Sequence, residues 1–458
     1  MVRGALGWVT LALLAGCGAK TGLLVPDLGL DEDAATDMPP DVPEDVPACV
    51  PFREVAELAS IDLMLLVDTS GSMDDAVDGD PGAPSKAEAV AAAIEGFVRD
   101  DASDGVGIGL FLFPRVDEDV PDECVRDDQC GDDGLCRILD LCSQSRPGET
   151  DLCFDDQDCP VDGAFCRDLQ RCSGEDNGLC FDNADCPAGE LCSRDFGFCE
   201  NRVRCLPGDY RRPAVRLAPL PGNAAPVVDV LEAVEPDGAT PTAPALAGVI
   251  RRAQDRRQAS PGNKVVVLLA TDGFPTACDP AISPLDTDGS DGAGIPRVAE
   301  IAADGAAIGI DSYVIGVFQE ENRALAEVNL SEIARAGGTE EAVIISTDEP
   351  VTERLREILE ELRGAVQTCV YAIPDAGVLP DPADLTVRLL APGAEPEVLT
   401  PVADAAACDP FTGGYFFDPS VAPEERPGFV ELCPASCAVA ARDEVDVEMQ
   451  VGCDEAPR

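Results

Sequence analysis

The chain has no histidine among its 458 residues, and only 32 lysines and arginines against 88 acidic residues, giving a formal net charge of −56. It therefore lacks the commonest general base and the commonest zinc ligand of proteins. The shortage of basic side chains argues against nucleic-acid binding and against docking on anionic membranes, because both depend on clusters of lysine and arginine.

Cysteine pairs of the form C-x-x-C are also absent, although the chain has 21 cysteines. Zinc and iron–sulfur sites commonly use such pairs, and so many cysteines are unusual in a reducing cytosol. We therefore expect disulfides in an exported protein. The length allows about two to four domains.

The first 17 residues hold an apolar run of about a dozen residues, shorter than the roughly 20 that span a membrane. The run follows Arg3 and ends in Leu14-Ala15-Gly16-Cys17, which is typical of a secretory signal and resembles a bacterial lipobox. The resemblance implies lipidation of Cys17 and attachment to the cell envelope, at the outer membrane or cell surface. An ordinary signal with an incidental cysteine is the alternative.

Residues 18–59 are rich in aspartate, glutamate and proline. This composition disfavours helix and sheet and cannot bury a core. We expect an extended, self-repelling tether.

The sequence Asp68-Thr69-Ser70-Gly71-Ser72 follows the apolar run of residues 61–67. A buried strand that ends in an acid and two hydroxyls presents oxygen ligands at the carboxyl end of a sheet, where a hard divalent cation can bind. Two further segments belong with it: residues 238–242, Gly-Ala-Thr-Pro-Thr, and residues 264–273, a second apolar run that ends in Thr-Asp-Gly.

These three segments resemble a von Willebrand factor type A domain, whose metal-ion-dependent adhesion site combines D-x-S-x-S with a later threonine and a later aspartate. The resemblance implies one cation, Mg²⁺ or else Mn²⁺ or Ca²⁺, held directly or through water. Thr240 is preferred to Thr242 because the family's ligand is the first threonine of such a pair. The implied ligands are Asp68, Ser70, Ser72, Thr240 and Asp272.

The expected fold of residues 60–368 is α/β, a doubly wound and mostly parallel sheet covered by helices on both faces. Alternating apolar runs and helix-like periodicity support it. We expect strands at 61–67, 105–113, 264–271, 310–317 and 342–346, an antiparallel edge strand at 212–217, and helices at 85–98, 224–233, 243–258, 295–303, 321–336 and 351–366.

An insertion at residues 116–205 interrupts this domain with three sets of four cysteines spaced mostly by five or six residues, and Dickkopf-like repeats of bacterial surface proteins are similar in spacing. It has few large apolar residues, so disulfides must stabilise it. We expect pairing within each set, although four cysteines allow three connectivities. The sets are Cys124, Cys130, Cys136 and Cys142; Cys153, Cys159, Cys166 and Cys172; and Cys180, Cys186, Cys192 and Cys199.

The insertion leaves the second strand at the expected metal-binding edge, so it is either a specificity element or a plain spacer. Cys205 and Cys278 form a plausible disulfide that braces this edge. Residues 369–458 predict a small β-rich module tied by Cys369, Cys408, Cys433, Cys437 and Cys453, with strands at 385–390, 414–417 and 445–449.

These features predict a lipid-anchored adhesion protein, not an enzyme, that captures a carboxylate of a protein or glycan partner through the metal. One alternative is an envelope protein whose cysteine-rich modules bind while the metal only stabilises the fold. A metal-dependent hydrolase is a minor alternative, since the chain offers no histidine and no nucleophile elbow.

Overall fold

The computed structural model describes most of the chain from Phe52 to Val451. The described residues are 52–77, 82–121, 123–131, 134–138, 140–143, 152–153, 159, 164–168, 170–173, 179–195, 197–199, 201–282, 289–290, 292–367, 369–373, 385–417, 428–442 and 444–451. The predicted signal, the tether up to residue 51 and the cysteines Cys17, Cys49 and Cys453 lie outside them. Among the described residues, no helix combines the length and the apolar character that a membrane span requires.

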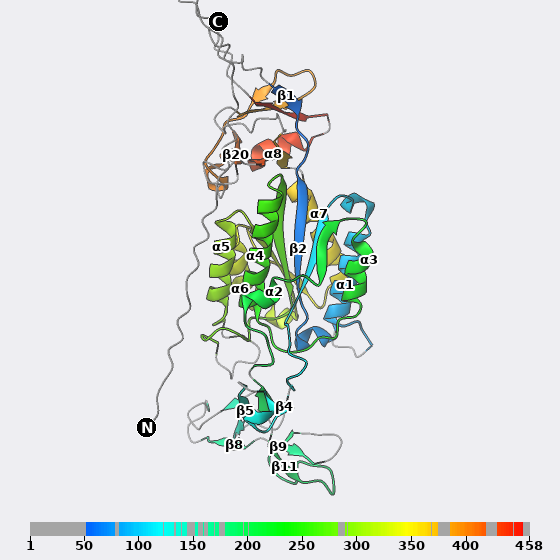
Figure 1. Ribbon diagram of the computed structural model, residues 1–458, viewed down its shortest axis with the longest axis vertical. Coiled ribbons are helices and arrows are strands. Elements are labelled where there is room, and N and C mark those ends of the chain that lie inside the picture. Colours follow the sequence, from blue (N-terminus) through cyan, green and yellow to red (C-terminus); the bar gives the residue numbers. More distant parts are fainter. Residues whose placement is uncertain are drawn as a thin grey trace, which may run out of the picture. The chain divides into compact units, whose positions relative to one another are not determined.

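A six-stranded sheet of order β13-β3-β2-β14-β15-β16 forms the centre of the α/β domain (Figure 1). Five strands run parallel to one another, namely β3, β2, β14, β15 and β16. The strand at one edge, β13, pairs antiparallel with β3. The predicted fold class is therefore confirmed. The strands are β2 (Ser60–Asp68), β3 (Gly107–Phe113), β13 (Val215–Pro219), β14 (Asn263–Thr271), β15 (Asp311–Phe318) and β16 (Val343–Ser346).

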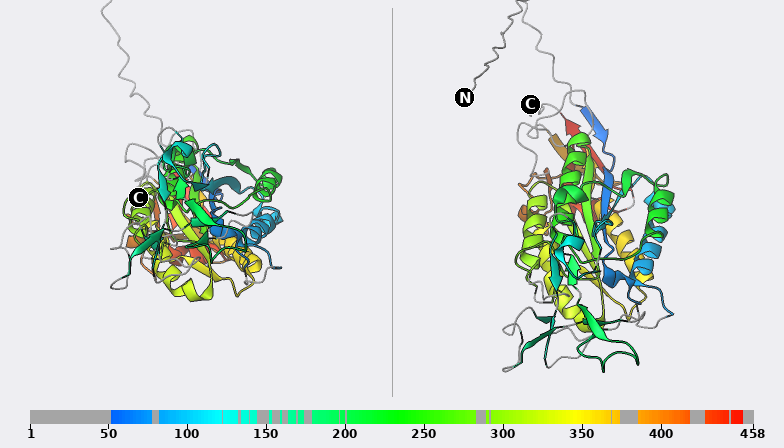
Figure 2. Two further views of the ribbon diagram at one scale, coloured as in Figure 1. Left: turned by 90° about the horizontal axis from the view of Figure 1, so that it is seen from below. Right: turned by 60° about the horizontal axis from the view of Figure 1, so that its bottom comes forward.

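Helices cover both faces of this sheet (Figures 1 and 2). Along β2, Leu63, Leu65 and Val67 pack toward α1, α3 and α7, whereas Met64 and Leu66 pack toward α4, α5 and α6. Burial on both faces explains why the strands are continuous apolar runs. The helices are α1 (Lys86–Val98), α2 (Pro207–Tyr210), α3 (Ala224–Leu231), α4 (Thr242–Ala259), α5 (Ile295–Ala306), α6 (Arg323–Ala336) and α7 (Val351–Gln367).

The start of α1 agrees with the sequence prediction. Ser85 caps the helix by accepting a hydrogen bond from the backbone of Glu88, whose side chain in turn accepts one from the backbone of Ser85. This reciprocal capping box satisfies two backbone donors that the helix itself cannot. It also fixes where Lys86, the first residue of the helix, enters the fold.

The insertion contains three small sheets, each of three strands, in the orders β7-β6-β8, β10-β9-β11 and β4-β12-β5. Its strands are β4 (Glu123–Cys124), β5 (Cys136–Ile138), β6 (Asp140–Cys142), β7 (Leu152–Cys153), β8 (Cys166–Asp168), β9 (Gln170–Cys172), β10 (Leu179–Cys180), β11 (Cys192–Asp195) and β12 (Gly197–Cys199).

The predicted pairing within each set of four cysteines is wrong. One disulfide in each set is internal, and the other three join different sets. The bonds are Cys124–Cys136, Cys153–Cys166 and Cys180–Cys192 within sets, and Cys142–Cys159, Cys172–Cys186 and Cys130–Cys199 between them. Because the cysteines are almost evenly spaced, the sequence does not show where one repeat ends and the next begins. The pairing of the strands decides which cysteines bond to one another.

Two of the three sheets, β7-β6-β8 and β10-β9-β11, take their middle strand from the preceding set of cysteines. The sheet β4-β12-β5 takes its middle strand from the end of the insertion. In this sheet β12 lies between β4 and β5, and the disulfide Cys130–Cys199 holds β12 in place. The insertion thus begins and ends in the same repeat. Its two connections also pair beside the α/β domain, through a bridge between Val116 and Val203.

The C-terminal module holds two sheets, β1-β22-β18-β19 and β17-β21-β20. The strands predicted at 385–390, 414–417 and 445–449 are present, and the disulfides are Cys369–Cys437 and Cys408–Cys433. Its elements are β1 (Phe52–Val55), β17 (Val370–Ala372), β18 (Leu385–Leu390), β19 (Glu397–Val398), β20 (Tyr415–Phe417), β21 (Phe429–Leu432), α8 (Pro434–Ala440) and β22 (Asp446–Val451).

One boundary of the predicted tether is wrong. Residues 52–55 form β1, which pairs antiparallel with β22, and Ala56 and Ala59 are buried. The partner strand lies about 400 residues away in the sequence, so the acidic, proline-rich local composition could not reveal this pairing.

Candidate metal-binding site

Three loops meet at the carboxyl edge of the sheet and carry the predicted ligands. The turn after β2 is held to β3 because the backbone and the hydroxyl of Thr69 both donate hydrogen bonds to the carbonyl of Phe113. The loop before α4 joins this turn, since Gly71 N–H donates to the carbonyl of Gly238 at 2.9 Å. Gly238 has a φ of +82°, a conformation that side chains disfavour.

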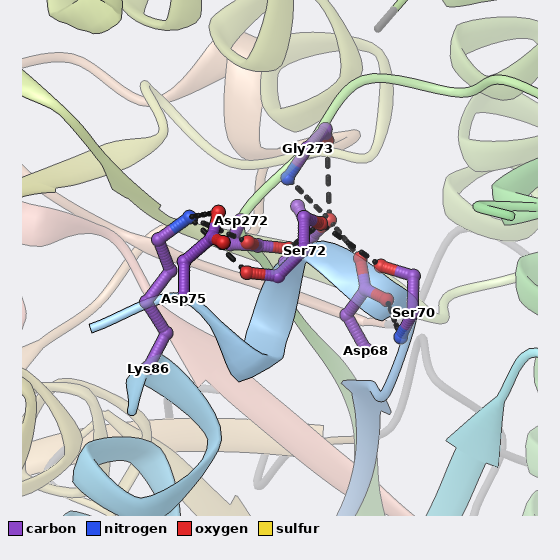
Figure 3. A network of polar contacts seen from close by, with 8 residues as sticks. Asp68, Ser70, Ser72, Asp75, Lys86, Asp272 and Gly273 are labelled. Atoms are coloured by element: carbon purple, nitrogen blue, oxygen red, sulfur yellow. Dashed lines mark hydrogen bonds and ion pairs between the residues drawn. The ribbon is translucent and has the colours of Figure 1, made fainter. Parts of the chain in front are cut away.

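Asp68 is fully buried, and both of its carboxylate oxygens accept hydrogen bonds from within the site (Figure 3). Oδ1 accepts from the backbone N–H of Ser70 at 2.9 Å, and Oδ2 accepts from the hydroxyl of Thr271 at 2.5 Å. These contacts suit a carboxylate that orients a cation's ligands or acts through water.

Hydroxyl groups link the first loop to the last. The Oγ atoms of Ser70 and Ser72 lie 3.3 Å apart, and Ser72 donates to Oδ1 of Asp272 at 2.9 Å. A cavity of about 260 Å³ opens here, and its lining includes Ser72, Thr240 and Asp272. Neither Asp68 nor Ser70 is part of that lining, and neither is Thr242.

Lys86, which the sequence interpretation missed, also lines this cavity. Its Nζ lies 2.8 Å from Oδ2 of Asp272 and 3.5 Å from Oδ2 of Asp75, and it donates to the carbonyl of Ser72 at 3.4 Å. Figure 3 shows the ammonium group beside the two carboxylates. One signal was available: a cation at the first position of a helix opposes the helix dipole, so it needs a compensating anion.

Burial controls the protonation of the two central acids. Burial raises the pKa of Asp68 most, and the nearby charge of Asp272 also raises it. Hydrogen bonds from Thr271 and Ser70 lower it, and together these effects place the pKa at about 7. Burial also raises the pKa of Asp272, against the opposing effect of Lys86. Two acids that repel each other without a cation are the arrangement that a divalent cation would stabilise.

The donor set fits a hard divalent cation. Carboxylate and hydroxyl oxygens are the ligands that Mg²⁺, Mn²⁺ and Ca²⁺ prefer. Oxygens from all three loops lie close together: a Cβ placed on Gly273 would lie 3.7 Å from Oγ1 of Thr240 and 3.9 Å from Oγ of Ser72. Thr240 is itself held by its N–H, which donates to the hydroxyl of Thr276.

A disulfide, Cys205–Cys278, links the end of the insertion to the loop that follows Asp272. This is the pair proposed from the sequence. Arg202, three residues from the end of the insertion, forms an ion pair of 2.5 Å with Asp237, which precedes Gly238 in the Thr240 loop. The base of the insertion therefore contacts two of the three loops of the candidate site.

No protein-family model and no curated protein matches the chain. Among solved structures, the chain is similar to the PilB minor pilin from Streptococcus sanguinis, at 13% identity and a TM-score of 0.39, over 69% of this chain and 63% of the pilin. It is also similar to a von Willebrand factor type A from Catenulispora acidiphila (12% identity, TM-score 0.32, 88% of this chain and 64% of the other). A third similar structure is the manganese-loaded TRAP protein of Plasmodium vivax (14% identity, TM-score 0.28, 68% of this chain and 77% of the other). The chain spans less than two thirds of the length of the pilin.

Proposed function

We propose that this protein is an exported binding protein that captures a carboxylate of a protein or glycan partner through a divalent cation. The ion would be held by Asp68, Ser70, Ser72, Thr240 and Asp272. The observation that carries the proposal is the cavity at the sheet edge, where oxygens from separate loops meet beside buried acids. When bound, the cation would supply a Lewis-acidic position that accepts one carboxylate oxygen.

The surroundings of the site favour adhesion over catalysis. Three of the five proposed ligands are neutral hydroxyls, and Lys86 offsets the charge of Asp272. A divalent cation would therefore be under-compensated in charge and open to an anionic partner. The chain has no histidine that could act as a general base. We propose Mg²⁺ as the ion, with Mn²⁺ or Ca²⁺ as possible substitutes.

Export is supported by the nine disulfides among the described residues, because such bonds persist in oxidising compartments. We propose that a lipidated Cys17 anchors the protein in a bacterial cell envelope. Residues 18–51 would then be the tether that separates the folded part from the membrane.

The insertion is proposed to contribute to specificity. Its paired connections, Val116 and Val203, lie beside the Thr240 loop, since a Cβ on Gly238 would contact both side chains at 3.2 and 3.7 Å. A partner that reaches the metal would therefore approach the protein next to the insertion.

Titration of Mn²⁺ and Mg²⁺ into the protein lacking residues 1–17 tests the metal site. We expect saturable calorimetric binding in the parent and loss of at least about tenfold in affinity in a folded Asp68→Ala, Asp272→Ala variant, because two carboxylates leave the site. Equal heats from both proteins would mean that cations bind only the diffuse acidic surface. Circular dichroism of both proteins checks the fold.

A second candidate function is partner binding by the insertion itself. Three large apolar residues, each directly before the third cysteine of its set, are about half exposed: Leu135 at 51%, Phe165 at 52% and Leu191 at 56%. Two of these positions are fixed by paired hydrogen bonds, between Phe165 and Ser143 and between Leu191 and Ser173. The repeats thus present the same kind of side chain at the same position.

Substituting all three residues by serine separates the two functions. Exposed side chains contribute little to folding, within about 0.5 kcal/mol each, so the variant should stay folded. Surface plasmon resonance against immobilised partner candidates is the measurement. Binding by the insertion should persist in EDTA, and its affinity should fall at least about tenfold in the triple variant. Binding through the metal should be lost in EDTA. If the insertion is a plain spacer, metal-dependent binding should survive the three substitutions.

A further inference from the structure

Lys86 places a positive charge inside the candidate metal site. Its side chain is only 6% exposed, and the Asp272 side chain that it contacts at 2.8 Å is completely buried. The same ammonium donates to the backbone carbonyl of Ser72, the residue whose hydroxyl donates to the other oxygen of Asp272. Lys86 therefore lies against the same carboxylate that would bind the metal ion.

The use of lysine at this position is notable for this chain. Of its 32 basic residues only three are lysines, namely Lys20, Lys86 and Lys264. An arginine would spread its charge over a planar fork, whereas an ammonium is a compact point charge comparable with a small cation. Lys264 lies at the other end of β14 from Asp272, where it pairs with Asp311 and Glu431, and it offers a natural control.

We propose that Lys86 acts as an internal competitor of the metal and makes metal binding depend on an anionic partner. This inference rests on the proposed function and concerns its regulation. With Asp68 and Asp272 ionised, these two acids and Lys86 together carry one net negative charge, so a divalent cation brings the three to one net positive charge. Asp75 lies 3.5 Å from the ammonium but its side chain is 62% exposed, so solvent screens its charge. Without Lys86 the same ion would bring the site to neutrality.

A carboxylate that binds to the ion removes this excess positive charge. Lys86 thus weakens the binding of the ion alone and strengthens the coupling between ion and carboxylate. Coupling of this kind is reciprocal, so the carboxylate raises the affinity for the ion by the same factor as the ion raises the affinity for the carboxylate. The affinity of the site for its metal would therefore be high only when the partner's carboxylate is also bound.

The test compares Mn²⁺ titrations of the parent with two neutral variants, Lys86→Met and Lys86→Gln, at pH 8. The glutamine amide can still donate a hydrogen bond to Asp272, so Lys86→Gln should fold even if Lys86→Met does not. Both should bind Mn²⁺ about 10- to 100-fold more tightly than the parent, as expected for removal of one unit charge at short range. Lys264→Met, at the other end of β14, should keep the parent's affinity.

Acetate serves as the anionic probe in the same titrations. Saturating acetate should raise the affinity for Mn²⁺ more in the parent than in Lys86→Gln. Affinity in Lys86→Gln that equals or falls below that of the parent, or an equal acetate effect in both, would overturn the proposal. Absence of saturable binding in the parent and in both neutral variants would instead overturn the proposed metal site, and this inference with it.

Discussion

Replacing Asp68 by asparagine should make the metal-free protein more stable at pH 8 and should abolish its stabilisation by Mn²⁺. Asp68 is fully buried, and its pKa is raised from 3.8 to about 7 in the folded protein. An acid with a raised pKa in the folded state stabilises the fold below its ordinary pKa, and this contribution is lost as the pH rises to about 7. Asparagine has no charge to bury.

The difference in stability between variant and parent should therefore be close to zero near pH 4 and should grow to at most about 4 kcal/mol at pH 8. Chemical denaturation in EDTA at a series of pH values measures it. In the parent, added Mn²⁺ should stabilise the fold more at pH 8 than at pH 5, because the ion binds the ionised carboxylates. A parent that is as stable as Asp68→Asn in EDTA at pH 8 would contradict this account.

Asp62 is the matched control, since it is a buried aspartate at the opposite end of the same strand. Its Oδ2 accepts hydrogen bonds from Arg256 at 2.6 Å and from Asn263 at 2.9 Å. Asp62→Asn removes the partner of a charged side chain and should destabilise the protein by roughly 2–4 kcal/mol. Metal binding should be unchanged. The two substitutions on β2 are thus expected to change stability at pH 8 in opposite directions.

Opening the closing disulfide of the insertion, by Cys130→Ser with Cys199→Ser, should loosen its first repeat while the α/β domain stays folded. This bond joins residues 69 apart, and loss of a disulfide from a small domain costs typically about 2–5 kcal/mol. The few apolar contacts of the insertion cannot offset that cost. Hydrogen exchange should show strong loss of protection at β4, β5 and β12.

The matched control is Cys180→Ser with Cys192→Ser, which removes a disulfide between residues only 12 apart in another repeat. Its effect should stay within β9, β10 and β11. Unchanged protection of β4 and β12 after loss of Cys130–Cys199 would show that the strand pairing alone holds the insertion closed. Limited proteolysis gives an independent readout of the same opening.

The sequence predicted the α/β domain well because its information is local. Apolar runs such as residues 61–67 form strands buried on both faces, and Ser85 followed by Glu88 marks a helix start. Asp68 and Asp272 follow parallel strands, so their meeting at one edge followed from strand direction, whereas Thr240 was placed by the resemblance to the type A domain. These features need no knowledge of distant partners.

The pairing of segments within the insertion and of β1 was beyond the sequence. The disulfides of the insertion depend on which strands form a sheet, and β1 depends on β22 at the far end of the described chain. Lys86 was missed for a similar reason, since its partner Asp272 lies 186 residues away. Its position at a helix start, where a cation is unfavourable, was the one local sign.

The order of β1 and β2 along the chain has a mechanical consequence. Only four residues separate Val55, the end of β1, from Ser60, the start of β2, and β2 leads directly to Asp68. In a protein held from its N-terminal side and pulled at the metal edge, tension would enter the α/β domain along this segment, and the pairing of β1 with β22 would pass part of it to the C-terminal module. The ladders that join β2 to β3 and β14 would then be loaded in shear, with many hydrogen bonds resisting together, so the candidate site would sit at the end of a strand that is held on both sides.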